Sequence, residues 1–122
     1  MKCINKNRLG ANGELIARNF LTDKNLKFLK NNYRYDRAEV DLIFEDEKKK
    51  ILLFIEVKTR RSKEYGEPEE SVTHSKQQQI KKATLGFISE NEMYSEHDLR
   101  IDIISIFLGE GKVEINHIEN AF

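Results

Sequence analysis

Hydrophobic side chains recur with two different periods along the chain, and each change of period marks a boundary between helix and strand. Segment 9–22 has apolar or small residues at helical spacing, which predicts a helix with one buried stripe. The stripe of this first helix consists of Leu9, Gly13, Ile16, Ala17 and Phe20. A second helix is predicted over 69–90, and its stripe consists of Val72, Ile80, Ala83 and Phe87. Each helix is therefore expected to bury one face.

Short apolar runs bounded by charged or glycine-containing turns predict five β-strands. The predicted strands are 26–29, 39–44, 51–58, 99–108 and 113–118. The charged turn 45–50 indicates an antiparallel hairpin between the second and third strands. The order is helix, three strands, helix, two strands. Its simplest packing is an α/β fold in which helices flank a central mixed β-sheet of about five strands.

Composition limits the class of protein. The chain has 122 residues, of which 39% are hydrophobic and 34% charged, so we expect a single domain over 1–122. The net charge is zero, from 21 basic and 21 acidic residues, which argues against a protein that merely coats nucleic acid. Cys3 is the only cysteine, which excludes an intrachain disulfide and a cysteine-based zinc site. The N-terminal segment has no apolar signal core and no apolar run could span a membrane, so we expect a cytoplasmic protein.

One Glu-x-Lys triplet stands out from the rest of the charged residues. Glu56-Val57-Lys58 continues an apolar strand, whereas the other two triplets of this kind lie in turns. Because strand side chains alternate, Glu56 and Lys58 share one face. A carboxylate and an ammonium at the end of a buried strand are costly unless they are paired or metal-bound. The triplet is therefore either part of a site or an ion pair that closes the strand end.

The preceding strand adds a second carboxylate, Asp41. If the hairpin is centred between residues 47 and 48, Asp41 faces Phe54 and lies diagonal to Glu56, at roughly 7–8 Å. Two carboxylates at that reach can hold one hard divalent cation and would repel each other without it. A bound Mg²⁺ suits phosphodiester hydrolysis, in which Lys58 orients water or offsets charge in the transition state. The alternative is an ion pair of Lys58 with either carboxylate.

Charged residues outside the triplet are the remaining candidates. Lys76 starts from the core-facing stripe of the second predicted helix, and it either reaches a phosphate at the sheet edge or extends into solvent. Glu14 lies at the margin of the first stripe and is either a third metal ligand or a solvated flank residue. Arg60 and Arg61 belong to a basic stretch that follows the triplet, and we predict with Lys76 that they bind nucleic acid. The three histidines lack ligand-like spacing and are expected as surface or strand residues.

Several motifs extend over nearly the whole chain in a recognisable order. They are Gly10-x-x-Gly13-Glu14 with Ala17, Glu39-Val40-Asp41-Leu42-Ile43, Phe54-Ile55-Glu56-Val57-Lys58-Thr59-Arg60, Tyr65-Gly66, Ser71-Val72-Thr73 before Lys76-Gln77, Arg100-Ile101-Asp102 and Asn120-Ala121-Phe122. The set resembles the YraN-like family of predicted bacterial endonucleases, which is similar to archaeal Holliday-junction resolvases and other PD-(D/E)xK proteins. Two positions depart from the family pattern: Ala38 replaces a usual glycine, and Ile101 replaces a phenylalanine. Neither departure removes a candidate catalytic group.

The resemblance implies a restriction-endonuclease-like fold and a site in which Asp41 and Glu56 bind Mg²⁺ or Mn²⁺. Lys58 would be the catalytic lysine and Glu14 an accessory acidic ligand. The expected activity is endonucleolytic cleavage of DNA, including branched DNA in repair or recombination, with no membrane partner. A homodimer is one of the assemblies open to the chain. The alternatives are a non-catalytic nucleic-acid-binding module and an adaptor for a protein partner, and the sequence does not separate branched, single-stranded or damaged DNA, or RNA, as the substrate.

Overall fold

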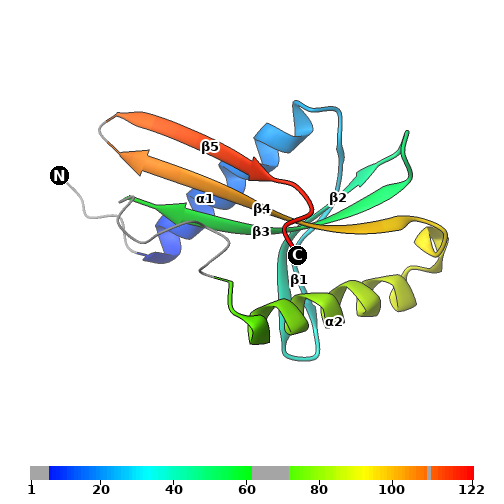
Figure 1. Ribbon diagram of the computed structural model, residues 1–122. Helices are drawn as coiled ribbons and strands as arrows, with labels where there is room; N and C mark the ends of the chain where they lie inside the picture. The colour runs from blue at the N-terminus through cyan, green and yellow to red at the C-terminus, as the bar shows by residue number, and fades with distance from the viewer. Residues whose placement is uncertain (1–5, 62–71, 110) are drawn as a thin grey trace.

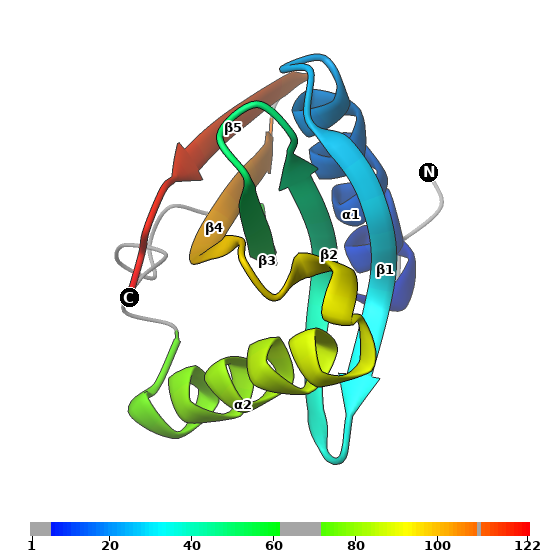
Figure 2. The ribbon, with the colours of Figure 1, turned by 90° about the vertical axis from the view of Figure 1, so that its right-hand side faces the viewer.

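The computed structural model describes residues 6–61, 72–109 and 111–122, with the side chains described from Asn12 onward. Its elements are α1 (Lys6–Thr22), β1 (Lys27–Tyr35), β2 (Ala38–Asp46), β3 (Ile51–Arg60), α2 (His74–Glu90), the 3₁₀ turn η2 (Glu92–Tyr94), β4 (Asp98–Gly109) and β5 (Lys112–Ile118). The predicted order of helices and strands is confirmed, and so is the α/β fold with a five-stranded mixed sheet and helices on both sides (Figures 1 and 2). No helix in the described part of the chain is long and apolar enough to cross a membrane.

The strands lie in the sheet in the order in which they occur in the sequence. Neighbouring strands are antiparallel, except that β3 and β4 are parallel. A parallel pair needs a crossover connection, and here α2 supplies it and lies against the sheet. The crossover therefore places the N-terminal end of α2 near the end of β3.

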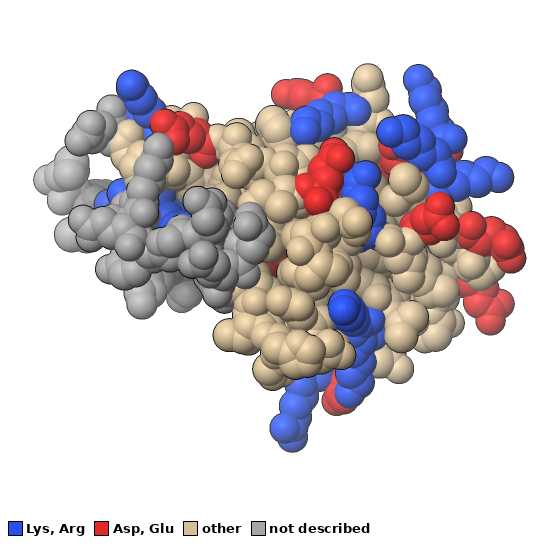
Figure 3. Space-filling view, in the orientation of Figure 1, with Lys and Arg blue, Asp and Glu red and all other residues tan. Residues whose placement is uncertain are grey.

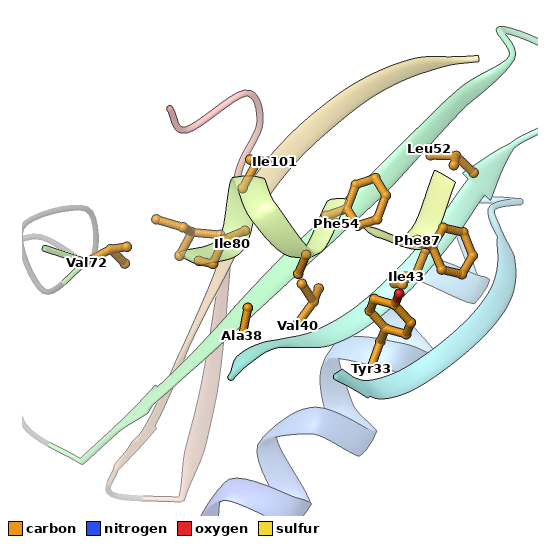
Figure 4. Packing of buried hydrophobic residues seen from close by; sticks show 12 residues of the cluster. Tyr33, Ala38, Val40, Ile43, Leu52, Phe54, Val72, Ile80, Phe87 and Ile101 are labelled. Atoms are coloured by element: carbon orange, nitrogen blue, oxygen red, sulfur yellow. The ribbon is translucent and has the colours of Figure 1, made fainter. Parts of the chain in front are cut away.

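Each face of the sheet has its own hydrophobic core because each is covered by one helix. On the α1 side the fully buried residues are Ala17, Leu21, Leu42, Phe44, Leu53, Ile55, Ile104 and Ile106. On the α2 side the buried residues include Tyr33, Val40, Ile43, Leu52, Phe54, Ile80, Ala83, Phe87, Ile101 and Ile103 (Figure 4). The central strands contribute to both cores, so their sequences are almost continuously apolar.

Two elements differ most in length from the sequence prediction. β1 extends to Tyr35, well past the predicted 26–29, because an edge strand half in solvent does not need alternating apolar residues. α2 begins at His74, later than the predicted residue 69. The preceding residue, Thr73, is the N-cap, and its side chain accepts a 3.2 Å hydrogen bond from the Lys76 backbone N–H. Of the predicted helical start, residues 69–71 lie outside the described part of the chain.

The hairpin between β2 and β3 is confirmed, but its predicted register is wrong by two residues. Asp46 pairs with Ile51, so the turn contains four residues and Ile43, rather than Asp41, lies opposite Phe54. The turn is closed by a 3.1 Å hydrogen bond from the Lys49 backbone N–H to the Asp46 carboxylate. A hydrophobic pattern does not show where such a turn begins and ends, and the length of the turn sets which residues of the two strands face each other.

Candidate active site

The candidate site lies where β2 and β3 separate. Leu42 and Ile55 are the last pair of the antiparallel ladder between these strands. Beyond them β2 continues along β1, while β3 continues along β4. Asp41 and Glu56 are the next residues on the two strands, so both carboxylates lie at this fork in the sheet.

The carboxylate of Asp41 ties the two sides of the fork together. Its Oδ2 accepts a 2.8 Å hydrogen bond from the backbone N–H of Val57, which lies on the opposite strand. A bond from a backbone N–H to an ionised carboxylate is stronger than one between neutral groups. Asp41 is therefore held in a fixed position beside the start of the Glu-x-Lys triplet.

Two lysines from different elements approach the same oxygen of Glu56. The Nζ of Lys58 is 3.6 Å from Oε1, and the Nζ of Lys76 is 3.8 Å from it. Lys58 follows two residues later on the same strand, whereas Lys76 extends from the first turn of α2. Glu56 is only 7% exposed, but both lysine side chains remain partly in solvent. The buried carboxylate thus has two partly exposed counter-ions.

The charges at the fork disfavour full ionisation of both acids. Burial, and next the negative charge of Asp41, raise the pKa of Glu56 from 4.5 to about 7, although Lys76 and Lys58 oppose this rise. Burial also raises the pKa of Asp41, against the hydrogen bond from Val57 and the charge of Lys76. When two close carboxylates both have raised pKa values, the nearby positive charge is too small to stabilise both ionised forms. The fork would therefore be stabilised by an additional cation.

The donor set suits a hard divalent cation, since carboxylate oxygens are the preferred ligands of Mg²⁺ and Mn²⁺. Asp41 and Glu56 are the residues that would hold it. Within the described ranges, no group of three or more His, Cys, Asp or Glu side chains is arranged to hold a metal ion. A cation at the fork would thus have two protein carboxylates, with water as the remaining ligands.

Glu14, predicted as an accessory acidic residue, lies in α1 on the Asp41 side of the fork. A Cβ atom at the preceding Gly13 would collide with the Thr59 hydroxyl oxygen, so glycine lets α1 approach β3 closely here. Partial burial raises the pKa of Glu14, as do the charges of Asp41 and Glu39. Glu14 is therefore an electrostatic neighbour of the fork, rather than a remote flank residue.

The predicted nucleic-acid-binding residues separate into two groups. Lys76 lies at the carboxylates, where it contacts Glu56. Arg60 is the last residue of β3, two positions beyond Lys58 on the same face, and Arg61 follows it and is exposed. On the face shown in Figure 3, basic and acidic side chains are interspersed. Contact of nucleic acid with this face would thus depend on local groups rather than on a broad positive field.

Another buried carboxylate, Asp102, entered the sequence analysis only as part of the motif Arg100-Ile101-Asp102. Asp102 is fully buried in β4, and it accepts hydrogen bonds of 3.0 Å from both the Nε and an Nη of Arg100, 2.7 Å from His117 and 2.9 Å from the Asn120 backbone N–H. Burial alone would raise the pKa of Asp102, but these bonds outweigh it and lower the pKa. His117 is a strand residue as predicted. The cluster anchors the C-terminal tail, because the next residue, Ala121, donates to the Ile101 carbonyl.

The fold and the fork together define an α/β protein with a paired-carboxylate and lysine site at a break in its sheet. The chain matches the model of the uncharacterised protein family UPF0102 over residues 13–106. It therefore belongs to the UPF0102 family, which is the YraN-like family that the motifs resemble.

Individual relatives are similar over 81–100% of their own length. The chain is 41% identical over 124 residues to a UPF0102 protein of Natranaerobius thermophilus, covering 98% of this chain and 100% of the relative. It is 40% identical over 114 residues to a UPF0102 protein of Pelobacter propionicus, covering 93% of this chain and 81% of the relative. A UPF0102 protein of Caldanaerobacter subterraneus is 38% identical over 125 residues, covering 100% of both chains. These names identify a family and not an activity.

Proposed function

We propose that this protein is a metal-dependent DNA endonuclease of the PD-(D/E)xK type. The observation that carries the proposal is the meeting of Asp41 and Glu56 at the fork, with Lys58 beside them. Buried acids with raised pKa values are costly for folding, and such acids cluster at functional sites. The resemblance of the motifs to PD-(D/E)xK proteins supports the same assignment.

Each residue has a defined part in this proposal. Asp41 and Glu56 would hold Mg²⁺ or Mn²⁺, which when bound polarises a phosphoryl oxygen and lowers the pKa of a coordinated water. The hydrogen bond from Val57 holds Asp41 in position before any cation arrives. Lys58 is partly exposed and can turn from Glu56 toward the phosphate, where its ammonium offsets the negative charge of the transition state.

The substrate in this proposal is DNA in the cytoplasm, branched or processed during repair or recombination. A second candidate is a non-catalytic nucleic-acid-binding module. It is favoured by the two ion pairs of Glu56, because in that case Lys58 and Lys76 simply neutralise a buried charge. Metal binding separates the two candidates, since only the nuclease needs a cation at the fork. A homodimer fits either of them.

A cleavage panel tests the nuclease directly. Labelled single-stranded, duplex, flapped and four-way-junction DNA would be incubated with the protein in Mg²⁺, Mn²⁺ or EDTA. We expect metal-dependent cleavage that Asp41→Asn abolishes, because the variant keeps the shape of the side chain and removes its charge. Glu47→Gln, in the exposed turn at the other end of the hairpin, is the matched control and should cleave normally. Equal cleavage by the Asp41→Asn protein would place the activity elsewhere.

A further inference from the structure

An open cleft is lined by residues at the C-terminal ends of β3 and β4 and at the start of β5. These strand ends lie at the left in Figure 1. Its volume is about 520 Å³, within the usual range of about 300–1,000 Å³ for ligand sites. It is lined by Arg61, Phe107, Leu108, Gly109, Lys112 and Glu114. The proposed catalytic residues do not include any of these side chains.

Strand pairing places this cleft on the same face of the sheet as Glu56 and Lys58. Arg60, which follows Lys58 on its face, pairs with Phe107 in the parallel ladder. Phe107 in turn pairs with Glu114 on β5, and paired residues direct their side chains to one face. At about 3.3 Å per strand residue, the four positions from Glu56 to Arg60 span about 13 Å. A short run of nucleotides can bridge that distance.

The ring of Phe107 extends along the strand and covers Gly109. A Cβ atom added at Gly109 would lie 2.7 Å from Cζ and 2.9 Å from Cε1 of this ring. Gly109 has no positive φ, so its backbone does not require glycine. The absence of a side chain instead makes room for the ring, which is half-buried at the cleft.

Basic side chains surround this aromatic surface. Arg61 and Lys112 line the cleft and are exposed, while Lys58 and Arg60 lie between the cleft and the fork. A row of cations beside an aromatic ring is the arrangement by which single-strand-binding proteins hold phosphates and stack bases. Because the chain has no net charge, stacking must supply a large part of the affinity.

We propose that the cleft binds an unpaired nucleotide of the substrate, with its base stacked on Phe107 and its phosphates near Arg61 and Lys112. A base inside a duplex has neighbours on both faces, so only an unpaired or splayed base can enter. The substrate class is therefore DNA with a single-stranded segment beside the bond that is cut. This inference rests on the proposed function for the identity of that bond.

Binding without cleavage tests the cleft separately from the nuclease. Fluorescence anisotropy in EDTA would compare a labelled single strand of about 12 nucleotides, within the range that such sites cover, with a blunt duplex of the same sequence. The proteins would be the wild type, Phe107→Leu and Gly109→Ala, where the second variant keeps the ring but displaces it. Leu99→Ala, at an exposed position near the other end of β4, is the matched control. Circular dichroism would establish that each variant is folded.

We expect the wild type to prefer the single strand. Phe107→Leu should weaken single-strand binding by about 5- to 100-fold, the range for one lost stacking contact, and Gly109→Ala should weaken it less. Leu99→Ala should leave the affinity unchanged. A 2-aminopurine base in the strand should be quenched by the wild type and much less by Phe107→Leu.

Two results would overturn the proposal: preference for the blunt duplex, or wild-type affinity and quenching in both cleft variants. Failure of the nuclease gives a different pattern. If the protein binds the single strand and stacks a base on Phe107 but never cuts DNA, the proposed nuclease activity is refuted and the proposed nucleotide-binding cleft is supported. If the protein cuts DNA but binds single strands without using Phe107, the proposed nucleotide-binding cleft is refuted and the proposed nuclease activity is supported.

Discussion

Glu56→Gln should stabilise the metal-free protein, although it removes two ion pairs. The pKa of Glu56 is raised from 4.5 to about 7 in the folded state, chiefly by burial. A carboxyl group with a raised pKa binds more protons when folded than when unfolded, so its contribution to stability falls as the pH rises. The decline runs from about pH 4.5, the unfolded value, to just above the folded pKa of about 7. Above that pH window the ionised Glu56 carboxylate lowers the free energy of unfolding by the full penalty that corresponds to its rise in pKa.

The size of the effect follows from the change in pKa. At about 1.4 kcal/mol per pKa unit, a rise from 4.5 to about 7 corresponds to a penalty on the order of 3 kcal/mol. Glutamine has the same shape and no charge, and the partly exposed Lys58 and Lys76 can turn to water when it replaces Glu56. For a domain of this length the gain at pH 8 corresponds to a rise in Tm on the order of 10 °C. At pH 5 the two proteins should be nearly equal.

Urea and thermal unfolding in EDTA between pH 5 and pH 8 would measure this difference. Glu47→Gln, in the exposed turn, is the control for removal of a negative charge and should show no such pH dependence. If Glu56→Gln were less stable than the wild type at pH 8, the ion pairs with Lys58 and Lys76 would be net stabilising. The buried triplet would then be a structural ion pair, and the physical argument for a cation site would fail.

Three further predictions concern single residues of the site and of the core. Lys58→Ala should lower the cleavage rate at saturating DNA by about 10²-fold or more with a small change in DNA affinity, as measured in single-turnover kinetics; a loss of affinity with normal cleavage would make Lys58 a phosphate contact. Lys76→Met should tighten Mn²⁺ binding in calorimetric titration, because the ammonium of Lys76 competes with a cation for Glu56; weaker binding would show that Lys76 supports the site instead. Asp102→Asn should destabilise the fold by about 3–5 kcal/mol in urea, since it leaves Arg100 and His117 without their buried partner. The pKa of Asp102 is lowered in the fold, so the wild type should keep this advantage above about pH 4 and lose it only in stronger acid, whereas a pH-independent difference would point to packing alone.

The sequence alone determined the element order, the fold class and the identity of the buried triplet. Apolar periodicity is a local property of the chain, and a charge that interrupts a buried strand is visible in the same pattern, as at Glu56. The sequence predicted β1 only over 26–29 and missed its extension to Tyr35, because most of that part of the strand is exposed to solvent. The family followed from spaced motifs, which the similarity to UPF0102 proteins confirms.

Only the tertiary structure decided which side chains meet. The hairpin has a four-residue turn, which contains the bond between Asp46 and the Lys49 backbone. The resulting shift of two residues places Ile43 instead of Asp41 opposite Phe54 and leaves the hydrophobic pattern intact. The sequence left Lys76 either at a phosphate or in solvent, and only the crossover of α2 places its ammonium beside Glu56. The pairing of β4 with β5 likewise brings His117 to Asp102. The Phe107 ring lies over Gly109 by close approach along the strand. Periodicity along one chain specifies which face each side chain occupies, but contacts between elements depend on register and crossover, which are set by bonds between distant residues.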